Sequence, residues 1–194
     1  MSLIDQLVQQ IGGQEVNNLS QNLGSNEQST QNAIMKALPM LIGALSKQTG
    51  TREGAFNIAS MLDSDGDGQI LDDLAGFFSQ SDNGAGPSIL DSLFGGKKAG
   101  VTNGLSQMTD LDPSQAGNLL ENLAPVVMGF LGNQKKNQGL NVSAIAGLLG
   151  NEAQKVQEGG QGSDAMGFLN NFLDSDGDGS SMDDIAGMLG NLMK

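Results

Sequence analysis

Two acidic stretches of the chain have the same sequence. The heptapeptide Leu-Asp-Ser-Asp-Gly-Asp-Gly occupies residues 62–68 and returns at 173–179, and both copies continue into a pair of aspartates, at 72–73 and at 183–184. Counted from Asp63 or Asp174 as loop position 1, each copy has carboxylates at positions 1, 3 and 5 and glycine at position 6. This pattern suits a hard cation with six to eight oxygen ligands, because the glycine permits the sharp turn that lets the side chains converge. The spacing therefore predicts two calcium sites.

The loops resemble shortened EF-hand loops, in which position 7 supplies a backbone carbonyl and a bidentate acid at position 12 closes the shell. Position 12 is Leu74 or Ile185 here, so an earlier acid must close the shell. We expect Asp73 and Asp184 to do so, with the preceding aspartate as an outer ligand or as a charge in the first turn of the next helix, where the dipole favours it. The expected ligands of the first loop, 63–73, are Asp63, Asp65, Asp67, Gln69, Asp72 and Asp73. Those of the second loop, 174–184, are Asp174, Asp176, Asp178, Ser180, Asp183 and Asp184.

Two other interpretations of these stretches compete with calcium. A solvated surface turn would explain one copy, but a turn tolerates Asn, Ser or Lys at positions where both copies keep Asp. Magnesium prefers a tight octahedron and retains water, whereas many protein oxygens on a loop suit the larger ion. Calcium is therefore the cofactor we predict.

The composition excludes several other kinds of chemistry. The formal charge is −13, and ten of the 22 acidic residues lie in the two loops with their Asp pairs. The chain has no His, Cys, Trp or Tyr, which removes zinc, haem and thiol chemistry, a His-activated serine, and the aromatic lining usual in sugar sites. Nine basic residues scattered along an acidic chain do not form the footprint that nucleic acid requires. We expect a protein that is not an enzyme and does not bind nucleic acid.

No segment is predicted to enter a membrane. The N-terminal residues have no basic region and reach Asp5 too early for a secretory signal. The most apolar run, 123–131, has nine residues, and a membrane-spanning helix needs about twenty. We therefore expect a cytoplasmic protein, with export without a leader left open.

The sequence contains an internal repeat. Residues 2–45 align without a gap on 88–131 when they are shifted by 86, whereas the acidic loops are 111 residues apart. The second copy therefore has about 25 extra residues, most of them near 150–162. We predict a first helical repeat at 1–80, a linker at 81–87 and a second helical repeat at 88–194.

The predicted fold class is all-α, an internally duplicated helical module with two EF-hand-like calcium loops. No alternating strand pattern of useful length occurs, and each copy opens with an N-cap signal, at Ser2 and at Ser88. Segments 37–45 and 123–131 are apolar on every side, which predicts two buried helices, each kinked or restarted at its proline, Pro39 or Pro125.

The chain contains, in order, an Ala-Leu-Pro helix, a Gly-Ala helix, and Leu-Asp-x-Asp-Gly-Asp-Gly followed by Asp-Asp-Leu. In this order of its motifs it resembles the bacterial YidB-like proteins, grouped as domain of unknown function 937. Residues 30–78 carry the best match, and the second copy matches in pieces. The resemblance implies an all-helical fold that has been likened to a homeodomain, and no established activity.

The function that we expect is a calcium-binding, non-catalytic structural or interaction module in which the ion clamps helices in each repeat. A sensor that exposes a Met-rich surface is a second hypothesis, since the chain has ten Met. A homeodomain-like DNA-binding module is a third, opposed by the charge. A protein partner or a homo-oligomer is expected from the apolar faces of short, Gly-rich helices.

Overall fold

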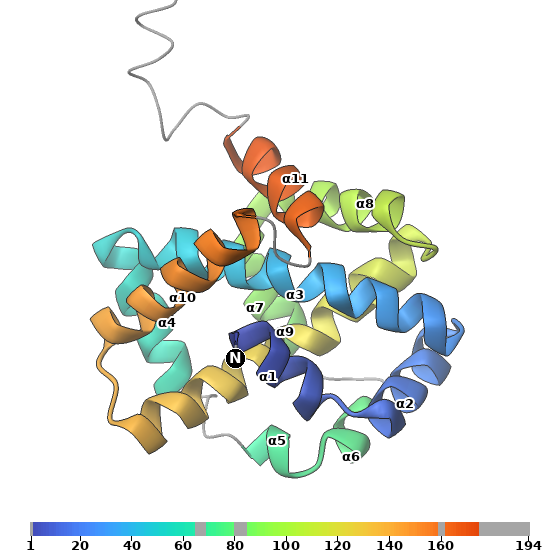
Figure 1. Cartoon of the computed structure of the whole chain (residues 1–194), viewed down its shortest axis with the longest axis horizontal. Helices are drawn as coiled ribbons and strands as arrows, with labels where there is room; N and C mark the ends of the chain where they lie inside the picture. The colour runs from blue at the N-terminus through green and yellow to red at the C-terminus, as the bar shows by residue number, and fades with distance from the viewer. Residues whose placement is uncertain (1, 65–68, 80–84, 159–161, 175–194) are drawn as a thin grey trace, which may run out of the picture.

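The computed structural model describes residues 2–64, 69–79, 85–158 and 162–174, and over these ranges the regular secondary structure is helical (Figure 1). The all-α prediction is confirmed for this part of the chain. The helices of the first half are α1 (Leu3–Gln10), α2 (Gly13–Leu23), α3 (Glu27–Thr49), α4 (Arg52–Ser64), α5 (Gln69–Asp72) and α6 (Leu74–Ser79). Those that follow are α7 (Ala85–Phe94), the 3-10 turn η1 (Gly95–Lys97), α8 (Lys98–Met108), α9 (Pro113–Gln138), α10 (Val142–Gln157) and α11 (Ser163–Asp174).

Two long helices, α3 and α9, form the centre of the molecule and contact each other. Every residue of 37–45 in α3 and of 123–131 in α9 is buried, as the apolar runs predicted. Both helices continue without a break through Pro39 and Pro125, so neither restarts at its proline. Their surroundings hold them together where the local hydrogen bond is missing.

The other helices cover this pair (Figure 1). Helices α7 and α8 pack mainly on α9, α10 and α11 pack on α3, and α4 contacts α3, α9 and α10. The short helix α6 packs on α2, and α5 packs on α9. Buried residues from both predicted repeats form one core cluster. The described residues of 1–80 and of 88–194 therefore share one hydrophobic core, and the predicted linker 81–87 ends inside α7, which begins at Ala85.

Local signals fix most of the helix starts. Ser2 and Asp5 form a capping box, in which Ser2 Oγ accepts from Asp5 N (3.0 Å) and Asp5 Oδ2 accepts from Ser2 N (3.1 Å). Asn26 caps α3 and Asp112 caps α9, the latter with Pro113 at the first helical position. The predicted cap at Ser88 is wrong, because α7 already begins at Ala85. Pro87 lies in the first turn of α7, where its missing N–H costs nothing.

Glycines lie over the carbonyls that the two prolines leave without a helical donor. A proline at position i removes the bond to the carbonyl of residue i−4, which is Met35 for Pro39 and Glu121 for Pro125. A Cβ added to Gly86 would lie 2.1 Å from the oxygen of Glu121, and one added to Gly162 would lie 3.3 Å from the oxygen of Met35. Close backbone packing at both prolines therefore depends on a residue without a side chain.

Candidate functional site

Each predicted calcium loop begins at the C-terminal end of a helix. Asp63 is the second-last residue of α4, and Asp174 is the last residue of α11. Neither helix has a basic residue in its last turn. The negative end of the helix dipole lies there, so an acidic residue at this position is unfavourable until a cation approaches. The prediction that a helix leads into each loop is confirmed.

The two aspartates at the end of the first loop are exposed and lie between two short helices. Asp72 is the last residue of α5, and Asp73 directly precedes α6. Asp73 Oδ1 accepts a hydrogen bond from Gly76 N at 2.8 Å, which is the geometry of an N-cap. The residue that we expect to close the first shell therefore also starts α6.

The remaining predicted ligands lie largely outside the described residues. Asp65, Asp67, Asp176, Asp178, Ser180, Asp183 and Asp184 lie outside the described ranges. For Asp63, Gln69 and Asp174 the structure gives the helical backbone position, with Gln69 the first residue of α5. The described ranges contain no group of three His, Cys, Asp or Glu side chains that could hold a metal ion. The predicted sites therefore depend on the two loops themselves.

The elements on either side of the first loop share one contact, with α9, and otherwise pack on different helices. Before the loop, α4 buries Ile58, Ala59 and Leu62 and contacts α3, α9 and α10. After the loop, α6 buries Leu74 and Phe78 and contacts α2. In Figure 1 the two elements lie at different edges of the molecule. The first loop thus joins α4 to α5 and α6, which have α9 as a common neighbour.

The glycine-lined surface under α11 positions the start of the second loop. A Cβ on Gly100 would lie 1.9 Å from Cζ of Phe172, and one on Gly104 would lie 2.0 Å from Cζ of Phe168. The two phenylalanine rings stack on each other with centroids 5.6 Å apart. A Cβ on Gly43 would lie 2.5 Å from Sδ of Met166, so α11 also approaches α3 closely at this glycine. Helix α11 is therefore held by contacts that admit no extra methyl group.

An ion pair and a buried hydrogen bond also attach the last two described helices. Lys36 of α3 pairs with Asp164 of α11, and this ammonium group lowers the pKa of the Asp164 carboxyl below its usual value of 3.8. Glu152 of α10 is 3% exposed, and its Oε1 accepts from Ile4 N at the start of α1 (3.2 Å). No sequence signal pointed to Glu152, because its partner lies 148 residues away.

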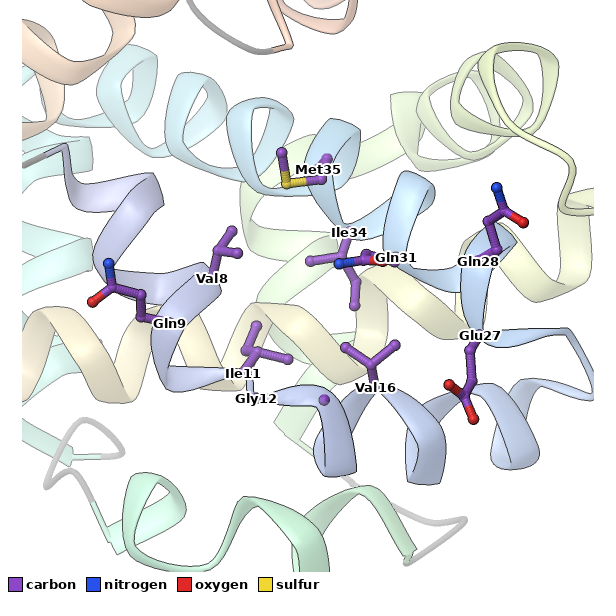
Figure 2. A pocket seen from close by; sticks show the side chains of 11 residues that line it. Val8, Gln9, Ile11, Gly12, Val16, Glu27, Gln28, Gln31, Ile34 and Met35 are labelled. Carbon is purple, nitrogen blue, oxygen red and sulfur yellow. The ribbon is translucent and has the colours of Figure 1, made fainter.

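A pocket of about 480 Å³ lies between α1, α2 and α3 (Figure 2). The sequence does not indicate this pocket, because its apolar residues have the same helical spacing as ordinary core residues. Its lining comprises Val8, Gln9, Ile11, Gly12, Gly13, Val16, Glu27, Gln28, Gln31, Ile34 and Met35. The pocket is separate from the acidic loops in sequence.

Comparison with protein families gives one match. The family model described as bacterial protein of unknown function (DUF937) matches residues 5–134, from α1 into α9. The match includes the first acidic loop and the predicted linker, and α10, α11 and the second loop lie beyond it. The search of curated proteins and the search of solved structures gave no significant match. None of the helices in the described ranges has the length and hydrophobicity that a membrane crossing requires.

Proposed function

Since the chain belongs to the DUF937 family of bacterial proteins, whose function is unknown, we propose a function from its own residues: it is a calcium-binding, non-catalytic structural or interaction module. The observation that carries the proposal is the recurrence of one acidic heptapeptide directly at the ends of α4 and α11. Each site would take one Ca²⁺ through the aspartates of the loop and a backbone carbonyl.

The electrostatics of the helix ends support a cation at both loops. Asp63 and Asp174 lie where the helix dipole is negative, and each is followed by further aspartates at spacings of two residues. Five aspartates within eleven residues repel one another at short range unless a cation lies between them. A bound calcium ion would remove both unfavourable terms.

A clamping role follows from the way in which the first loop is anchored. Helix α4 is fixed on α3, α9 and α10, and α5 and α6 are fixed on α9 and α2. An ion that binds residues from both ends of the loop would tie the end of α4 to the start of α6 in addition to their packing on the core. The N-cap bond from Gly76 N to Asp73 keeps one predicted ligand at the start of α6.

Internal duplication is part of the proposal, and helix bounds support it. Shifted by 86 residues, α3 (Glu27–Thr49) falls on 113–135 within α9, and its cap Asn26 falls on Asp112. Asn26 Oδ1 accepts from Ser29 N and Asp112 Oδ1 accepts from Gln115 N, so the two capping bonds are also 86 residues apart. Two copies of one module explain why the same acidic heptapeptide occurs twice in one chain.

Isothermal titration with calcium tests this function, with magnesium as competitor. We expect two calcium ions per chain in the native protein and one in Asp63→Ala or Asp174→Ala. Asp110→Ala is the control, because Asp110 is an exposed acid outside both loops. No heat of calcium binding in the native protein would overturn the proposal. Retention of both sites in the two loop variants would overturn the assignment of the ligands.

Two further hypotheses give different outcomes in simple experiments. A sensor would expose apolar surface on binding calcium, whereas a clamp would bury or leave unchanged the surface that it has. Among the described residues, Phe56 of α4 is the large hydrophobic residue that is exposed to solvent, at 72%.

Homo-oligomerisation stays a prediction, and light scattering with calcium present tests it. A monomer at high protein concentration would contradict it.

A further inference from the structure

The pocket between α1, α2 and α3 has an aliphatic wall. Val8 comes from α1, Val16 from α2, and Ile34 and Met35 from α3, with Ile11 between the first two helices. Figure 2 shows the side chains of Val8, Ile11, Val16 and Ile34 converging on one space. Ile11 and Ile34 are buried, and the other three side chains are partly buried. The wall is therefore apolar surface that the protein itself covers only in part.

The rim of the pocket is polar and carries no positive charge. Carboxamides of Gln9, Gln28 and Gln31 line it, and each offers both a hydrogen-bond donor and acceptors. Glu27 is the charged residue of the lining, and its carboxylate accepts from Asn17 Nδ2. None of the described residues that line the pocket is basic, and the chain as a whole has a charge of −13. An anionic ligand would therefore meet repulsion without a compensating contact.

The corresponding position in the second half of the chain has different chemistry. A shift of 86 residues places Val16 on Thr102, Met35 on Glu121 and Gly12 on Lys98, and all three line a depression at α8 and α9. Lys98 Nζ and Glu121 Oε1 form an ion pair there at 2.9 Å. The aliphatic wall is thus a property of the first pocket and not of this pair of helices in general.

We propose that the pocket between α1, α2 and α3 binds a small uncharged ligand with an aliphatic or aromatic body and a hydrogen-bonding end. Its volume of about 480 Å³ lies within the usual range of ligand pockets. The five aliphatic side chains take the body of the ligand, and the carboxamides of the rim orient its polar end. This site is independent of calcium, since none of its lining residues belongs to either loop.

Two fluorescent probes with the same arene body test the charge preference. N-phenyl-1-naphthylamine is uncharged and carries one N–H, and 8-anilinonaphthalene-1-sulfonate adds a sulfonate to the same rings. We expect saturable binding of the uncharged probe, at least about tenfold tighter than binding of the sulfonate. Absence of saturable binding, or equal or tighter binding of the sulfonate, would overturn the proposal.

Variants then locate the bound probe. A Cβ added at Gly13 meets no atom within 4 Å, and Gly13 lines the pocket, so Gly13→Leu adds a large side chain at the lining without a steric clash. We expect it to weaken binding of the uncharged probe by about tenfold or more. The matched control is Ala99→Leu, because Ala99 has the equivalent position beside α8 and α9 and should leave binding unchanged.

A second variant keeps the test decisive if Gly13→Leu does not fold, as judged by circular dichroism. Met35→Glu introduces the residue found at the equivalent position 121 and places a carboxylate in the aliphatic wall. We expect a similar loss of binding from this partly buried position. Unchanged affinity in the folded variant or variants, or an equal loss in Ala99→Leu, would place the probe elsewhere and refute the site.

Discussion

Replacement of Gly86 by alanine should separate the two helices that meet at Pro125. Gly86 is the second residue of α7 and is buried against α9. An added Cβ would lie 2.1 Å from the oxygen, 2.8 Å from the carbonyl carbon and 3.1 Å from the Cα of Glu121. All three are backbone atoms of a central helix, so the clash cannot be relieved by rotation of a side chain. Non-bonded heavy atoms prefer separations of about 3.5–4.0 Å, and α7 must therefore move by more than about 1 Å.

The cost of this movement follows from what α7 buries. Its buried large apolar side chains are Ile89, Leu90, Leu93 and Phe94. Overpacking of a close contact costs about 1–3 kcal/mol, and each fully buried side chain of this size contributes about 1.5–3 kcal/mol that a shifted helix partly loses. We expect Gly86→Ala to lower the free energy of unfolding by about 3 kcal/mol, which is a fall in Tm of roughly 6–12 °C for a chain of this length.

Urea denaturation and thermal melting followed by circular dichroism measure this effect. The control is Gly147→Ala in α10, because Gly147 is exposed and helical and its added Cβ meets no atom within 4 Å. Alanine has the higher helix propensity, so the control should be more stable than the native protein by about 0.5–1 kcal/mol. Opposite signs for the two changes are the expected result. A stability of Gly86→Ala equal to that of the native protein would refute the close packing of α7 on α9.

Three further predictions concern the ions, a buried hydroxyl and an ion pair. Chelation of calcium should lower Tm, because saturation of each site at a hundred times its Kd adds about 2.7 kcal/mol, and readdition of calcium should restore Tm more fully than magnesium; an unchanged melt in chelator would contradict the metal sites. Thr30→Val should raise the free energy of unfolding, measured in urea, by about 1 kcal/mol. The reason is that Thr30 Oγ1 is fully buried without a hydrogen-bond partner among the described residues, and the equivalent position 116 is a buried alanine. A destabilised variant would show that the hydroxyl has a partner. The lowered pKa of Asp164 stabilises the fold at pH values above the unfolded-state pKa, by less than about 1 kcal/mol for an exposed pair, and this stabilisation is lost as the pH falls through the folded-state pKa. The difference in stability between the native protein and Asp164→Asn should therefore disappear at acid pH. A difference that persists there would exclude this ion pair as its cause.

The residue-to-residue signals in the sequence determined the helices and their place relative to the core. Apolar runs at 37–45 and 123–131 predicted the two buried helices, and the N-cap signal at Ser2 predicted the start of α1. These predictions succeeded because capping bonds and apolar faces depend on residues only three or four positions apart. The two acidic loops likewise are read from the sequence alone, and their ion binding stays a prediction that titration with calcium decides.

Tertiary contacts decided what these local signals leave open. Helix α7 begins at Ala85 and not near Ser88, with Gly86 close against the backbone of α9, a contact that the residues around Ser88 do not reveal. The roles of Gly43, Gly86 and Glu152 depend on partners at least 30 positions away along the chain. The pocket of Figure 2 likewise arises only when three helices meet and leave part of their apolar surface uncovered. A short sequence window specifies the conformation of its own backbone, whereas packing and cavities are set by which distant surfaces the whole core brings together.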